Sequence, residues 1–256
     1  MTIPTTLPTA TEQAKAATQA ALEAGLLRIQ VEMAIPELKH QPIAEQFLSL
    51  FEGKQFKVLF PDAGAAALAR RDWSNPDFTI RGLGELVDPV EPDDDLYLIV
   101  NPSSVEVAKV EELCNAAIDQ PVLLLNPKLE DVAIVGIGYA ARQLRDRFLS
   151  QIETCYYIRA VDQGAVYRCY PGPWQVWRET APEEYDLAAS FASRPSGEDI
   201  ERVLYSEGTS EKTSEQADDL NKGIPSGERT DKSDAKTTRK KGLFSELQAF
   251  LKALSQ

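Results

Sequence analysis

The chain has 256 residues and a net charge of −13, from 27 basic and 40 acidic side chains. This acidity disfavours nucleic-acid binding, because phosphate backbones require concentrated Lys and Arg. Hydrophobic residues make up 43% of the chain, enough for a core in one large domain or two small ones. No apolar stretch approaches the roughly 18 residues of a membrane-spanning helix, and residues 1–17 lack the apolar middle of a signal peptide. We therefore expect a cytoplasmic protein or one peripheral to a membrane.

The residues of common catalytic and metal sites are scarce. The three cysteines, Cys114, Cys155 and Cys169, have no CxxC spacing, and His40 is the only histidine. This pattern predicts buried thiols in a reducing compartment and no metal site. The motifs GxxxxGK[ST], GxSxG and HExxH are absent, and no cofactor is required by the sequence. These observations weaken an enzymatic function without excluding it.

The first 125 residues alternate helices and strands. A lead-in over residues 1–10 precedes a helix that we expect Thr11 to cap and Gly25 to end. Strands are predicted over 27–35, 56–60, 78–81, 96–100 and 122–125, and further helices over 42–51, 65–71 and 105–117. Asp62 is expected to cap the helix 65–71, and Pro102-Ser103-Ser104 the helix 105–117. The acidic run 91–95 is interpreted as a solvated loop rather than a cation site.

The composition of the strands indicates the fold class. Most are near-continuous apolar runs, which is typical of strands covered by helices on both faces and favours a mainly parallel α/β sheet. Beyond Ile152, short Gly/Pro turns separate strands predicted over 153–160, 165–170, 175–179 and 185–191. These predict an antiparallel C-terminal extension of the same sheet. We expect residues 11–193 to form this domain.

The last 63 residues differ in composition from the domain. Residues 194–242 are rich in Ser, Thr and charged residues, with one aromatic, Tyr205. They predict a disordered linker, with a short helical turn over 199–204.

Residues 243–256 predict a short amphipathic helix. Its apolar stripe consists of Leu243, Phe244, Leu247, Phe250, Leu251 and Leu254, and a basic cluster precedes it: Arg239, Lys240 and Lys241. This combination predicts reversible docking to an anionic membrane surface or to a partner's groove. The alternative is that the helix packs on its own domain.

One glycine pattern resembles a dinucleotide-binding turn. Gly136 and Gly138 belong to a GxGxxA sequence between an apolar run and a helix expected over 142–149, and Asp162 follows at a distance resembling the ribose-binding acid. The glycines would let a pyrophosphate approach the helix N-terminus. The motif follows several α/β units and precedes antiparallel strands, so a tight strand-to-helix turn is the alternative.

Basic and aromatic residues near this turn offer two further candidate sites. Arg142 and Arg145 lie on one helix face and could hold a small anion; a solvated face is the alternative. Trp174 and Trp177 follow Pro171 and Pro173. They could form a docking surface, line a pigment-sized pocket, or pack a sheet edge.

Several stretches together resemble a known family: IAEQFLSLFEG, VLFPDAGAAALARRDW, IRGLGEL, VLLLNPKLEDVAIVGIGYAARQLRDRFL, CYYIRAV and YRCYPGPWQVW. It is a family of unknown biochemical function, shared by cyanobacteria and plastids, that includes the plant Low PSII Accumulation factor three. The resemblance covers roughly residues 8–190.

The resemblance implies a non-catalytic auxiliary factor in photosystem II assembly. Its expected partners are photosystem assembly factors or chlorophyll-protein subunits. Its expected location is the cytoplasm, peripheral to the thylakoid membrane and attached there through the C-terminal helix. A nucleotide- or small-anion-binding protein that uses Gly136, Gly138, Arg142 and Arg145 is the alternative hypothesis.

Overall fold

A nine-stranded sheet runs through the part of the chain that the structure, a computed structural model, describes: residues 2–85, 90–130 and 139–205. The strand order is β3-β2-β4-β5-β1-β6-β7-β8-β9. The strands are β1 Arg28–Met33, β2 Phe56–Phe60, β3 Thr79–Gly82, β4 Leu96–Val100, β5 Val122–Leu125, β6 Glu153–Val161, β7 Gly164–Cys169, β8 Trp174–Ala181 and β9 Glu184–Phe191. The strands β3, β2, β4, β5, β1 and β6 pair in parallel with their neighbours in the sheet. The strands β6, β7, β8 and β9 pair antiparallel. This confirms the predicted fold class.

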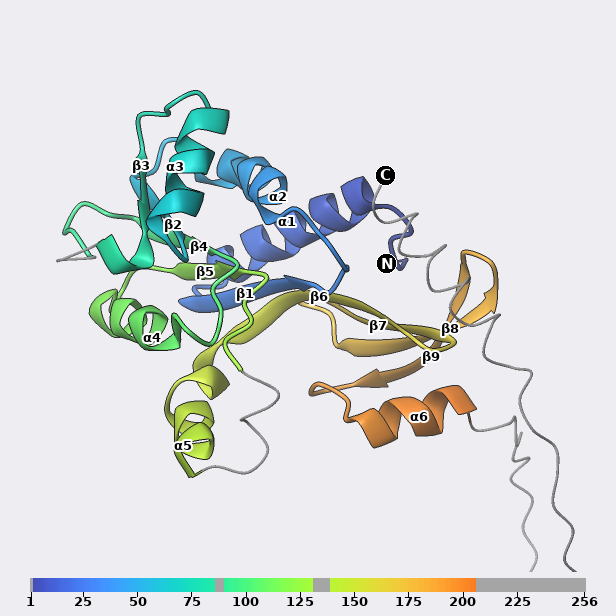
Figure 1. Ribbon diagram of the computed structural model, residues 1–256. Coiled ribbons are helices and arrows are strands. Elements are labelled where there is room, and N and C mark those ends of the chain that lie inside the picture. Colours follow the sequence, from blue (N-terminus) through green and yellow to red (C-terminus); the bar gives the residue numbers. More distant parts are fainter. Residues whose placement is uncertain (1, 86–89, 131–138, 206–256) are drawn as a thin grey trace, which may run out of the picture.

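Helices cover both faces of the sheet (Figure 1). One face, here the α1 face, carries α1 Leu7–Glu23, α2 His40–Phe47 and α3 Ala63–Asp72; the other, the α4 face, carries α4 Val107–Ala116, α5 Tyr139–Arg147 and α6 Gly197–Tyr205. Short 3-10 turns span Leu48–Phe51, Leu83–Glu85 and Leu149–Gln151. None of the helices in the described ranges is long and apolar enough to span a bilayer.

Side-chain alternation builds the core on the α1 face. Ile29, Val31 and Met33 of β1 are buried there against the alanine stripe of α1, which includes Ala14 and Ala17. Alanine at these positions lets the helix approach the sheet closely. Burial of one side chain of the size of Ile, Val or Met contributes about 1.5–3 kcal/mol to the free energy of unfolding.

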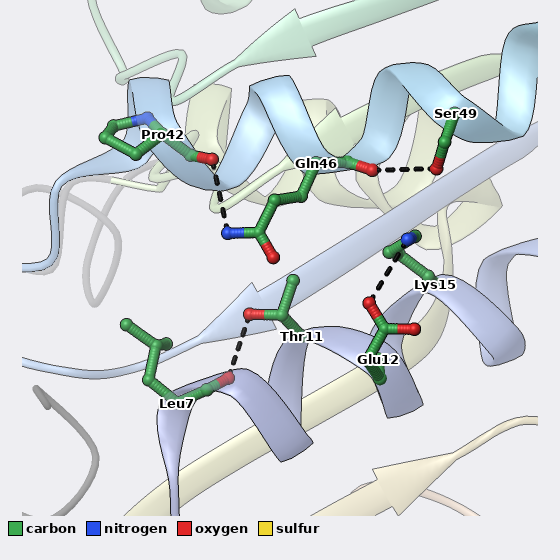
Figure 2. A network of polar contacts seen from close by, with 7 residues as sticks. All are labelled: Leu7, Thr11, Glu12, Lys15, Pro42, Gln46 and Ser49. Atoms are coloured by element: carbon green, nitrogen blue, oxygen red, sulfur yellow. Dashed lines mark hydrogen bonds and ion pairs between the residues drawn. The ribbon is translucent and has the colours of Figure 1, made fainter.

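The first helix begins earlier than predicted. Thr6 caps α1 by accepting a hydrogen bond from the amide of Thr9 at 3.3 Å, and Pro8 fits the first turn because no amide is needed there. Thr11 is buried within the helix, and its hydroxyl donates to the carbonyl of Leu7 at 2.9 Å (Figure 2). The cap expected at Thr11 is therefore wrong.

The caps of the later helices confirm one prediction and correct another. Asp62 caps α3, since its Oδ1 accepts from the amide of Ala65 at 2.9 Å. Helix α4 begins at Val107, without a serine cap. The amide and hydroxyl of Ser103 instead donate to the carboxylate of Glu106, at 2.8 and 2.6 Å, and form a separate turn.

The folded body continues past residue 193. Helix α6 packs on β8 and β9, Arg178 donates to the carbonyl of Val203, and the hydroxyl of Tyr205 donates to Asp162. The helical turn expected over 199–204 is confirmed as part of α6, so residues 194–205 belong to the folded body and not to the expected disordered linker. Residues 206–242 and the expected helix over 243–256 lie outside the described residues.

The acidic run 91–95 is not entirely solvated. Asp94 is buried and forms an ion pair of 2.8 Å with the ammonium group of Lys57, which is also buried. Its Oδ2 also accepts from the hydroxyl of Tyr97 at 2.6 Å and from the amide of Glu91 at 2.9 Å. The solvated-loop interpretation is wrong for Asp94, because the buried lysine comes from β2, a distant part of the chain.

Candidate functional site

A row of polar and aromatic side chains crosses the α4 face from the central strand β1 to the edge strand β9. Strand pairing places Glu32 of β1 beside Tyr157 of β6, Tyr157 beside Arg168 of β7, Arg168 beside Trp174 of β8, and Trp174 beside Phe191 of β9. We call these five residues the cross-strand row. Strand β1 has parallel neighbours on both sides, and such strands are normally apolar on both faces. Glu32 on this strand therefore marks the row as a candidate functional site.

Arg194, which precedes α6, packs across the row. Its guanidinium donates a 2.8 Å hydrogen bond to the hydroxyl of Tyr157 and lies 4.5 Å from that ring's centre and 5.6 Å from the ring of Trp174. The two rings contact each other with centroids 5.1 Å apart and are buried. Since the side chain of Arg194 remains 50% exposed, the rings hold an accessible guanidinium in a fixed position.

Arg168 is held in the same way. One of its terminal nitrogens bonds the carboxylate of Glu153, and its guanidinium lies 5.4 Å from the ring centre of Trp174. Its buried Nε has no hydrogen-bond partner within the described ranges. On the same face, Gln30 donates to the hydroxyl of Thr154 at 2.8 Å, so polar contacts continue along β1 and β6.

Burial dominates the electrostatics of Glu32. It raises the pKa of the carboxyl above the ordinary value of 4.5, although the nearby charges of Arg194 and Arg159 lower it. The ion pair with Arg194 is long, at 3.8 Å, which explains why it does not compensate the lost hydration. The pKa of Tyr157 is raised, mainly by burial, so its phenol stays protonated at neutral pH.

Replacement of Glu32 by Gln is expected to raise the free energy of unfolding at neutral pH. A raised folded-state pKa means that the carboxyl contributes stability in its protonated form, fully below pH 4.5, and that this contribution is lost as the pH rises through the folded-state pKa. Glu32→Gln resembles the protonated form, so its advantage should vanish below pH 4.5. Denaturant unfolding at both pH values measures this, with the exposed Glu112→Gln as control. A variant less stable than wild type at neutral pH would mean that the ion pair outweighs burial.

The chemistry of this face favours recognition over catalysis. Three guanidiniums, those of Arg159, Arg168 and Arg194, face two carboxylates, those of Glu32 and Glu153. Among these five groups, the guanidiniums outnumber the carboxylates by one. Arginine held on an aromatic ring suits planar anions such as carboxylates.

The thiols lie elsewhere and are poor nucleophiles. All three cysteines are buried, and burial raises the pKa of Cys114 and Cys155 to about 12 and also raises that of Cys169. The prediction of buried thiols is confirmed. Within the described ranges, no group of three or more His, Cys, Asp or Glu side chains could hold a metal ion.

The glycine turn is only partly described. Gly136 and Gly138 lie outside the described residues, and α5 begins at Tyr139, so a helix does follow the glycine pattern. Arg142 and Arg145 are exposed on this helix. Arg145 forms a 3.1 Å ion pair with Glu130, which raises its pKa.

Arg147, also on α5, and the sequence candidate Asp162 have protein partners as well. Arg147 binds the carboxylate of Glu111 through two nitrogens, at 2.7 and 2.8 Å. Asp162 accepts from the hydroxyl of Tyr205. The arginine contacts are those of a solvated, ion-paired helix face.

The two tryptophans do not form an exposed surface. Trp174 is buried on the α4 face, where it belongs to the cross-strand row, and Trp177 is buried in the core on the α1 face. The two residues are three positions apart on β8, and an odd spacing puts side chains on opposite faces of a strand. They contribute to packing rather than to a docking surface of free indoles. The docking residues expected in the tail, 239–254, lie outside the described residues.

One pattern in the sequence, polar residues that alternate with core residues, could have indicated this site. In RIQVEM, Gln30 and Glu32 alternate with core residues in a strand that proved to be central, and Tyr157 and Arg159 do the same in CYYIRAV. Polar alternation in a central strand distinguishes these segments from their apolar neighbours. The positions of Arg168 and Arg194 above Trp174 depend on strand pairing and had no local signal.

Comparison with known proteins gives a family but no structural relative. No solved structure matches the chain. One family model matches residues 4–202, which include every strand of the sheet and the cross-strand row. The chain therefore belongs to the family of the domain of unknown function DUF1995.

Proposed function

We propose that this protein is a non-catalytic assembly factor that acts at the thylakoid membrane surface in photosystem II biogenesis. It recognises an acidic segment of a partner, either an assembly factor or a chlorophyll-protein subunit. The partner's carboxylates bind the arginines of the α4 face, and the C-terminal segment brings the protein reversibly to the membrane.

The observation that carries the proposal is the set of arginines on the α4 face: Arg159 of β6, Arg168 of β7 and Arg194, which precedes α6. Arg194 is accessible and held by two buried rings, and Arg159 is exposed beside it. A fixed, positively charged surface gives orientation and specificity to an association without any bond being broken. The resemblance to the family that includes Low PSII Accumulation factor three supports the biological setting.

Affinity isolation from native membranes tests the recognition step. The variant Arg159→Ala/Arg194→Ala is expected to lose most of the co-isolated photosystem proteins, since each lost charge-assisted contact at an interface costs about 2–5 kcal/mol. Lys54→Ala/Arg71→Ala is the matched control, because it also removes two exposed positive charges, and neither residue belongs to the arginines of the α4 face. Equal recovery with both variants would contradict recognition by this face.

Membrane flotation tests the role of the C-terminal segment. Deletion of residues 236–256 is expected to reduce association with thylakoid vesicles, because it removes both the basic cluster and the apolar stripe. A second variant, Arg239→Gln/Lys240→Gln/Lys241→Gln, keeps the stripe and should give an intermediate, salt-sensitive loss. If the deleted protein floats like the full chain, the segment is not the membrane anchor.

A further inference from the structure

The carboxyl ends of β1, β2, β4 and β5 form an edge that parallel sheets commonly use to bind small molecules. The helices after β1 and β2 lie on the α1 face, while those after β4 and β5 lie on the α4 face. Since β2 neighbours β4 and β5 neighbours β1, the crossovers change face at two points along this edge. In open α/β sheets, ligands bind outside the strand ends at such switch points.

Two equivalent turns meet at this edge. Strands β4 and β5 are both followed by an Asn-Pro pair, and Asn101 and Asn126 both have left-handed backbones, with φ of 50° and 49°. The amide of Asn101 donates to the carbonyl of Leu125 at 2.7 Å, and the amide of Lys128 donates to that of Pro102, also at 2.7 Å. The two turns are therefore hydrogen-bonded side by side.

Both asparagine side chains have unmet hydrogen-bonding capacity. Oδ1 of Asn126 accepts from the backbone amide of Met33 at 2.7 Å, which fixes the orientation of the side-chain amide, since a flip would bring two donors together. Nδ2 of this residue, which is only 4% exposed, then has no partner within the described ranges. The same holds for the buried Oδ1 of Asn101. A buried donor and a buried acceptor without partners are costly in a native structure.

Positive charge lies beside the asparagines. Lys128 directly follows the second Asn-Pro pair in the sequence and is exposed. The charge of Lys128 acts on His40, the first residue of α2, and burial and this charge together lower the pKa of the imidazole. The two neighbouring turns therefore carry a buried donor and a buried acceptor without partners in the described ranges, and Lys128 of the second turn is exposed.

We propose that the paired Asn-Pro turns bind a small organic acid that carries a hydroxyl or amino group next to its carboxylate. The carboxylate accepts from Nδ2 of Asn126 and from the ammonium of Lys128, and the neighbouring hydroxyl or amino group donates to Oδ1 of Asn101. Adjacent strands lie about 4.8 Å apart, a distance that one such molecule spans. No covalent step is involved, and the site is independent of the arginines on the α4 face.

Nuclear magnetic resonance of the full-length ¹⁵N-labelled chain tests this site with glycolate and L-serine as probes. Both are expected to shift the side-chain amide resonances of Asn101 and Asn126 at millimolar concentration. Acetate, which lacks the neighbouring donor, should bind about tenfold more weakly, the change expected for one lost hydrogen bond. The imidazole signal of His40, the only histidine, should report an upward pKa shift when a carboxylate is bound.

Variants separate binding from folding. Asn101→Gly removes the acceptor and tolerates the positive φ, so it should fold and lose at least tenfold in affinity for glycolate. Gln163→Gly is the matched control, since Gln163 has a φ of 61° in the turn between β6 and β7. The proposal is overturned if neither probe moves the two amides, if Asn101→Gly binds like wild type, or if a crystal structure of the probe-free chain shows both amides bonded to protein atoms.

Discussion

Gly164→Val is expected to lower the free energy of unfolding by about 3 kcal/mol or more, at the upper end of the cost of overpacking. Gly164 opens β7 and pairs with Arg178 of β8. A Cβ at this position would lie 2.0 Å from the backbone oxygen of Trp177 and 3.1 Å from a methyl group of Leu204. Because the oxygen belongs to the β8 backbone, the substitution must separate the two strands or displace α6.

Chemical denaturation monitored by tryptophan fluorescence measures this effect, since Trp174 and Trp177 both lie on β8. Gly197→Ala is the matched control: nothing lies within 4 Å of a Cβ at that position. It should unfold at nearly the wild-type denaturant concentration. Equal midpoints for Gly164→Val and wild type would show that the β7–β8 backbones are not as close as the structure has them.

Asp94→Ala is expected to lower the free energy of unfolding by about 3–5 kcal/mol, the usual penalty for removing one member of a buried ion pair. Lys57 is 4% exposed, and its ammonium group lies 2.8 Å from Asp94. The carboxylate of Glu91 lies 3.4 Å from the same ammonium group. Because Glu91 is largely exposed, it would compensate the charge of Lys57 only in part. The substitution also removes the acceptor of the Tyr97 hydroxyl.

A double-mutant cycle gives the measurement. Lys57→Met/Asp94→Ala should recover much of the stability lost in Asp94→Ala, because the buried ammonium group that paired with Asp94 is also removed. The exposed pair Lys109–Glu112 provides the control, and Glu112→Ala should change the free energy of unfolding by no more than about 0.5 kcal/mol. If Asp94→Ala costs no more than this control, Lys57 is better solvated than its burial indicates.

The order and type of the elements could be predicted because they depend on local patterns. The bounds of β2, β4 and β5 were correct to the residue, since each is a largely apolar run followed directly by Pro or Asn. The antiparallel strands were found through their short turns. Element ends were less well predicted, as at Thr11, because several neighbouring Thr and Ser residues can each cap a helix and only the folded chain selects one.

The two candidate sites depend on pairings between distant segments. Glu32 and Trp174 are 142 positions apart in the chain, and they share a row only because β6 and β7 lie between their strands. Asn101 and Asn126 became a pair through the hydrogen bonds between their turns. Neither arrangement follows from spacing along the sequence.

The amino-acid sequence by itself determined the α/β class, the buried thiols and the antiparallel extension, since hydrophobic periodicity and turn residues act over a few positions. Only the tertiary structure decided which polar residues became accessible on central strands, which arginines became fixed on aromatic rings, and that Asp94 is buried with Lys57. These features arise from strand order and register, which place charges from separate segments within a few ångströms and thereby set their hydration and their partners.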